Sequence, residues 1–128
     1  MRIITETDAY KYEVDEAKNR ALVTFKKDPA GSRDEEKAGL KACQVMCDKL
    51  ERGFSILCDF RNMKATKAPD LFVAAQDMLI EAGVGKFAAV YSGKTFAKFQ
   101  MAGISEKRGL PVKVFFDMEE ALAWLDQD

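Results

Sequence analysis

Residues 10–25 read YKYEVDEAKNRALVTF, and this stretch decides the fold. Residues 10–15 and 20–25 both carry the aromatic and β-branched side chains that are typical of strands, and only residues 16–19 separate them. A connection of this length closes an antiparallel hairpin and is too short for the helix that a parallel crossover requires. The sheet therefore contains at least one antiparallel pair of strands.

Helix and strand patterns alternate after the hairpin. The periodicity predicts helices over residues 33–52, 69–83 and 95–108 and from Asp117 onward, with strands over residues 54–59, 86–91 and 112–116. Such alternation implies parallel strands joined by right-handed crossovers. We therefore expect one α/β domain over residues 1–128, with a mixed, mostly parallel sheet of five strands and four main helices.

The composition excludes several functional classes. The chain has 128 residues, 20 basic and 21 acidic side chains, a net charge of −1 and no histidine. A balanced charge gives no indication of nucleic-acid binding. Without histidine, the chain cannot build a Ser-His or Cys-His pair or a histidine-ligated metal site. We expect no metal and no cofactor, and we expect that the protein is not an enzyme.

The cysteines and the apolar runs indicate a reduced, cytoplasmic protein. Cys43, Cys47 and Cys58 are too few for a disulfide framework, and we interpret them as small buried side chains. The first ten residues lack the apolar core of a signal peptide. No apolar run approaches the roughly 20 residues of a transmembrane segment.

Two glycine-containing stretches resemble phosphate-binding motifs without their context. Residues 83–88 match the dinucleotide-binding spacing but follow a predicted helix, whereas the motif must follow a strand. Residues 93–95 (GKT) lack the earlier glycine of a P-loop, since Ala88 stands at that position. Residues 92–95 still open the third predicted helix and include a lysine. This helix N-terminus is either an anion-binding site or an ordinary N-cap.

Polar side chains lie at the carboxyl ends of the predicted parallel strands, where ligands bind in open α/β sheets. They are Asp59, Arg61, Ser92 and Asp117. This edge is the candidate site for the alternative in which the protein is an enzyme. The structural alternative is that Asp59 pairs with Arg61 while Ser92 and Asp117 cap helices.

Three stretches resemble the STAS superfamily, the fold of the bacterial anti-sigma-factor antagonists, and in particular its stand-alone SpoIIAA-like group. They are residues 56–63 (ILCDFRNM), residues 81–90 (EAGVGKFAAV) and residues 114–125 (VFFDMEEALAWL). The resemblance covers nearly the whole chain. It implies a non-catalytic regulatory module that acts by docking, and it adds lipid binding as an alternative.

The resemblance also implies where a phosphorylation switch would stand. In antagonists a serine that follows an aspartate opens the helix after the central strand. Here residues 67–71 read KAPDL, without serine, and Thr66 is the one nearby hydroxyl and has no preceding aspartate. We therefore expect a docking module without the typical phosphoacceptor.

Apolar side chains on the second and third predicted helices exceed what one buried stripe requires. Val73 and Ile80 lie opposite the buried face of the second helix. On the third helix, Phe96, Phe99 and Gly103 form a second stripe beside the buried one. We predict a contact surface there.

Charge is segregated around this contact surface. Lys94 and Lys98 rim it, within a basic stretch over residues 86–113, whereas the last twelve residues carry five acidic side chains and no basic one. The first expectation for its occupant is a second copy in a homodimer or another protein partner. A lipid or small anionic ligand is the alternative.

Overall fold

The computed structural model describes residues 1–93 and 95–127. Its sheet has six strands in the order β1-β2-β3-β4-β5-β6. The strands are β1 (Arg2–Glu6), β2 (Tyr10–Asp15), β3 (Arg20–Phe25), β4 (Ser55–Asp59), β5 (Lys86–Val90) and β6 (Val112–Phe115). β1, β2 and β3 pair antiparallel, and β3 to β6 pair parallel. The mixed, mostly parallel sheet and the β2–β3 hairpin are confirmed.

The prediction of five strands was wrong, because β1 adds a sixth at the edge of the sheet. β1 pairs with β2 through its backbone, with an irregularity between Ile3 and Thr5. Most of its side chains are exposed, Ile3 at 50% among them. The central side chains of β1 are β-branched, but Ile3 and Ile4 are adjacent and the strand lacks the period-2 alternation by which a half-buried strand is recognised.

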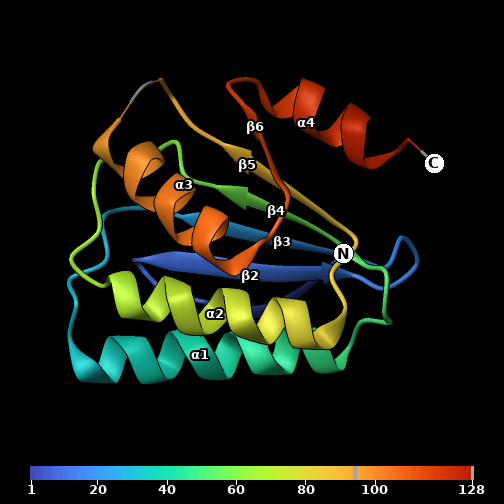
Figure 1. Cartoon of the computed structure of the whole chain (residues 1–128). Coiled ribbons are helices and arrows are strands. Elements are labelled where there is room, and N and C mark those ends of the chain that lie inside the picture. The colour runs from blue at the N-terminus through green and yellow to red at the C-terminus, as the bar shows by residue number, and fades with distance from the viewer. Residues whose placement is uncertain (94, 128) are drawn as a thin grey trace.

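In the part of the chain that the structure describes, four helices cover the sheet, as expected: α1 (Arg33–Asp48), α2 (Pro69–Ala82), α3 (Phe96–Arg108) and α4 (Met118–Leu125). Figure 1 shows α1, α2 and α3 on one face of the sheet and α4 on the other. Two apolar cores follow from this arrangement. The larger lies under α1 and α2, and the smaller packs α4 against β4 and β5.

Helix α1 ends at Asp48, four residues before the predicted end. Asn19, in the turn between β2 and β3, has a left-handed backbone with a φ of 51°. Its side-chain oxygen accepts the N–H of Glu51 at 2.8 Å, and its amide donates to the carbonyl of Glu51 at 3.0 Å. The bond to Asn19 takes the N–H of Glu51, which a helix continuing to residue 52 would donate to the carbonyl of Cys47, so tertiary contact overrides the local periodicity.

Candidate functional site

Asp59 and Arg61 form a closed pair at the end of β4. Asp59 is 5% exposed, and Nε and Nη2 of Arg61 donate to its Oδ1 and Oδ2 at 2.9 and 2.8 Å. The backbone N–H of Arg61 donates to the same carboxylate at 3.1 Å. The hydrogen bond to Asp59 raises the pKa of the Arg61 guanidinium. Both carboxylate oxygens therefore have partners, as the structural alternative predicts.

Asp117 and Ser92 differ in their surroundings. Asp117 is the N-cap of α4, and its Oδ1 accepts the N–H of Glu119 at 3.1 Å. Asp117 follows β6 and Arg61 follows β4, so both lie at the carboxyl edge of the sheet, with β5 between their strands. Ser92 is exposed beyond β5, and Thr95 caps α3 in its place. The edge thus gathers Asp59, Arg61 and Asp117, with Asp59 and Asp117 engaged in local hydrogen bonds.

The one hydroxyl near the expected phosphorylation position is buried. Thr66 is 5% exposed, and its Oγ1 accepts the N–H of Ala68 at 3.0 Å. The Gln100 side chain bonds both backbone groups of Thr66, accepting its N–H at 2.9 Å and donating to its carbonyl at 3.0 Å. A modifying enzyme could reach the Thr66 hydroxyl only after the loop before α2, which contains Thr66, had separated from α3.

Polar contacts hold α3 beside α2, in the arrangement visible in Figure 1. Near the first turn of α3 the bonds between Gln100 and Thr66 join α3 to the loop before α2. Farther along, the amide of Gln76 donates to Ser105 Oγ at 3.0 Å. At the end of α3, Arg108 pairs with Asp77 at 3.0 Å. The helices therefore run in the same direction, and their outer faces form one side of the molecule.

The residues predicted to form a contact surface lie on α2 and α3. We call the described ones the α2–α3 surface: Val73, Ile80, Phe96, Lys98 and Phe99. Phe96 and Phe99 are 65% and 63% exposed, Ile80 is 39% exposed and Val73 is half-buried. Nζ of Lys98 lies 5.5 Å from the ring centroid of Phe116, which is itself exposed. Lys94, the other predicted rim residue, lies outside the described residues.

A groove of about 450 Å³ separates the outer faces of α2 and α3. Its lining is mostly apolar, with basic groups at one end: Pro69, Val73, Phe99, Gln100, Gly103, Ile104, Lys107 and Arg108. Ile80, Phe96 and Lys98 were predicted to belong to the same surface but do not line the groove, and Lys98 lines a different groove on the other side of α3. The structure therefore brings Val73 and Phe99 together and leaves Ile80 farther along α2.

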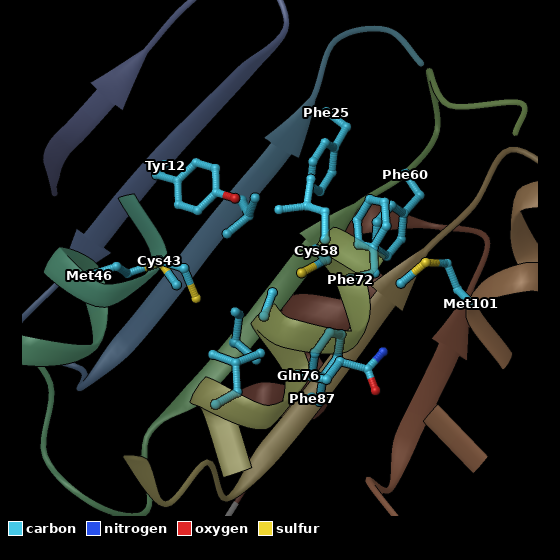
Figure 2. Close-up of a pocket in the computed structure, with 15 residues that line it drawn as sticks. Tyr12, Phe25, Cys43, Met46, Cys58, Phe60, Phe72, Gln76, Phe87 and Met101 are labelled. Carbon is cyan, nitrogen blue, oxygen red and sulfur yellow. The ribbon is translucent and has the colours of Figure 1, made fainter. Parts of the chain in front are cut away.

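The core contains an internal cavity under α1 and α2, and its size decides whether a lipid could bind inside the protein. Figure 2 shows its lining, in which Tyr12, Cys43, Cys58, Phe60 and Phe72 surround a space of about 40 Å³. That volume suits a few water-sized molecules at most and is too small for an acyl chain. A lipid bound to this conformation would have to lie on the surface.

The three cysteines are free and buried. Burial raises the pKa of the Cys58 thiol, and the hydrogen bond with Cys47 together with burial raises the pKa of Cys43. The same hydrogen bond lowers the pKa of Cys47, which lines a groove between α1 and α2. Cys58, beside Asp59, is therefore a poor nucleophile.

Residues 1–93 and 95–127 hold neither a metal-binding cluster nor a membrane-spanning helix. Within these ranges no group of three or more cysteine, aspartate and glutamate side chains could hold a metal ion. None of the helices described in these ranges is long and apolar enough to span a bilayer.

Comparison with known proteins supports the fold. No family model matches the sequence, and no curated protein matches it. The structure is similar to the crystal structure of an anti-sigma factor antagonist from Mycobacterium paratuberculosis, with a TM-score of 0.58 and 12% sequence identity. The match covers 96% of this chain and 99% of the other. The chain therefore has a STAS-like fold, in agreement with the resemblance in its sequence.

Sequence reasoning missed the polar residues that position α3. Gln100 lies between the two apolar stripes of the helix, and its bonds to Thr66 depend on a loop 34 residues earlier in the chain. The partner of Gln76, Ser105, lies 29 residues away. The sequence does show that Gln100 is a polar side chain at the border of an apolar stripe. That pattern does not show which group the side chain binds.

Proposed function

We propose that this protein is a non-catalytic docking module, one STAS-like domain over residues 1–128, that binds a protein through the α2–α3 surface. The exposure of Phe96 and Phe99, at 65% and 63%, carries the proposal. Contiguous exposed apolar side chains rimmed by polar groups usually mark an interface. The occupant is another copy of the chain or a different protein.

Several observations favour docking over catalysis. Asp59, the carboxylate on which an enzyme at the strand-end edge would depend, is held by Arg61. Burial raises the pKa of Cys58, and the sequence has no histidine to activate a nucleophile. The neighbour of the same fold is named an anti-sigma factor antagonist, which points to a protein as the occupant here.

We further propose that docking does not depend on the phosphoserine switch of typical antagonists. Residues 67–71 contain no serine, and the Thr66 hydroxyl is buried and hydrogen-bonded. Cytoplasmic location belongs to the same proposal, since three free, buried thiols suit a reducing compartment.

The test compares the wild type with Phe99→Glu, with Lys113→Glu as the control for a charge change on an exposed side chain of β6. Because Phe99 is exposed, its variant should keep the unfolding midpoint. We expect Phe99→Glu to lose self-association in sedimentation, or to lose a protein captured from extract of the source organism, while Lys113→Glu keeps it. If the wild type neither self-associates nor captures any protein that Phe99→Glu misses, the proposal is wrong.

The anionic alternative has a different signature. Lys107 and Arg108 line the end of the groove, whereas Lys98 lies on the other side of α3, over the ring of Phe116. An anionic ligand or lipid headgroup in this groove would bind more weakly after Lys107→Glu, and its affinity would fall steeply with salt. Binding to anionic vesicles with that salt dependence, together with no protein occupant, would favour this alternative.

A further inference from the structure

A second groove lies on the other side of α3, between this helix and β6. Its volume is about 320 Å³, within the range of roughly 300–1,000 Å³ that is typical of small-molecule sites. Its walls are mostly apolar side chains of α3, of β6 and of the loop that joins them: Met101, Ala102, Leu110, Pro111, Val112 and Val114. Of the residues predicted to form the α2–α3 surface, only Lys98 lines this groove. It is therefore a different site from the groove between α2 and α3.

One end of this second groove carries a cation. Lys98 is half-buried, and its Nζ lies 5.5 Å from the centroid of the Phe116 ring. No carboxylate of residues 1–93 or 95–127 forms an ion pair with it. A half-buried ammonium group has lost part of its hydration, and an anion beside it would compensate for that loss. This end of the groove therefore favours an anionic group.

Tyr91 lines the groove at the same end. Its backbone N–H donates to the carbonyl of Phe115 at 3.0 Å, next to Phe116, and its ring stacks on Phe60 with the centroids 5.2 Å apart. Burial raises the pKa of the Tyr91 hydroxyl, so this group is protonated at neutral pH and can donate a hydrogen bond. Tyr91 is 2% exposed, yet none of the described residues, 1–93 and 95–127, hydrogen-bonds its hydroxyl. A ligand oxygen would supply the missing acceptor.

The opposite end of the groove carries the opposite charge. Glu106 lines the groove about 12 Å farther along α3 than Lys98, at a rise of about 1.5 Å per residue. Ser105, the other polar residue at that end, already accepts the amide of Gln76 at 3.0 Å. A carboxylate is attracted at the Lys98 end and repelled at the Glu106 end, so an anionic ligand has one favoured orientation. Its apolar part would lie between the two charges, against Met101.

We propose that this groove binds a small amphiphilic carboxylic acid, with the carboxylate at Lys98 and Tyr91 and a short apolar chain between α3 and β6. The ion pair and the hydrogen bond orient such a ligand, and the burial of its chain supplies the remaining affinity. Because Glu106 closes the other end to an anion, the ligand has a single carboxylate. The inference does not rest on the proposed function, since Val73 and Phe99 line the other groove.

The first measurement is a titration of the isotope-labelled full chain with octanoate, followed by the NMR shifts of the backbone N–H groups. We expect saturable shifts at Met101 and Val114, and none at Val73, which lines the other groove. Octylamine, with the same chain and the opposite charge, should bind at least about ten-fold more weakly. A wild type without saturable shifts at Met101 and Val114, or with equal affinity for the two compounds, would overturn the inference.

The second measurement repeats the octanoate titration on variants. Lys98→Met removes the charge and keeps an unbranched chain, and Lys107→Met is the matched control, because Lys107 lies on the same helix but lines the other groove. We expect Lys98→Met to weaken octanoate binding about ten-fold and Lys107→Met to leave it unchanged. Ala102→Trp, a substitution at an exposed position, fills the groove and should abolish the shifts while the dispersion of the spectrum shows that the fold is kept.

Equal octanoate affinities of Lys98→Met and Lys107→Met would overturn the inference, and so would a folded Ala102→Trp that binds octanoate as the wild type does. The proposed function fails by a different result, docking that is unchanged by Phe99→Glu. The two failures are therefore distinguishable, because Phe99 does not line the groove between α3 and β6.

Discussion

The bonds between Gln100 and Thr66 should contribute more to stability than any other polar side-chain contact of α3 with its surroundings. The Gln100 amide makes two hydrogen bonds, at 2.9 and 3.0 Å, to the backbone of Thr66, a residue that is 5% exposed. Gln100→Leu removes both and leaves a buried N–H and a buried carbonyl without protein partners. Each net hydrogen bond contributes about 1 kcal/mol, and an unsatisfied buried group raises that loss.

We therefore expect Gln100→Leu to lower the free energy of unfolding by about 2–3 kcal/mol. For a chain of 128 residues that loss corresponds to a fall in Tm on the order of 10 °C. Urea unfolding followed by circular dichroism measures the free energy, and amide exchange at Thr66 reports the local opening. The exchange of the Thr66 N–H should accelerate in the variant.

Gln44→Leu is the matched control for this substitution. Gln44 also lies on a helix and also makes a side-chain bond, to Asp48 at 2.9 Å, but that bond is exposed. Its loss should change the free energy of unfolding by less than about 0.5 kcal/mol. Equal effects of Gln100→Leu and Gln44→Leu would refute the claim that the loop before α2 holds α3 in place.

Three further predictions concern other parts of the molecule. In the native protein a thiol reagent should modify Cys47 first, and Cys58 should react only on unfolding; fast labelling that survives Cys47→Ser would contradict this. The hydrogen bond from Arg20 lowers the pKa of Asp126 in the folded state. The pair therefore stabilises the protein at pH values above about 4, the ordinary pKa of a carboxylate, and this stabilisation is lost as the pH falls through the lowered pKa of Asp126. Wild type and Asp126→Asn should thus differ in unfolding midpoint at neutral pH and converge in acid. Asp59→Asn should cost about 1 kcal/mol in urea unfolding, a modest figure because its arginine partner is half-exposed, and should leave docking intact; lost docking at unchanged stability would make the strand-end edge a functional site.

Sequence reasoning predicted the fold well where one local rule decided the outcome. The gap at residues 16–19 fixed the hairpin, and Gly83 ended α2 in the left-handed conformation that favours glycine. It failed where a distant group decided, as at the end of α1, where Asn19 binds the backbone of Glu51. It also failed at β1, where backbone pairing rather than a buried face holds the strand.

The candidate site likewise combines features that the local sequence predicts with features that depend on distant contacts. The amphipathic pattern of α3 predicted an extra apolar stripe, and Phe96 and Phe99 are exposed in the structure. The pattern did not predict that a groove would form beside Gly103, because its depth depends on the distance between α2 and α3. That distance is set by pairs such as Gln76 with Ser105, which lie far apart in the chain.

The central claim, that the α2–α3 surface is covered when the protein functions, is tested most directly by hydroxyl-radical footprinting. The labelling of Phe96 and Phe99 would be compared between dilute purified protein and protein in concentrated extract of the source organism. Ile3, 50% exposed on β1 at the edge of the sheet, is the internal reference. The account predicts that Phe96 and Phe99 lose labelling in extract while Ile3 does not. Equal labelling of all three in the two conditions would contradict it.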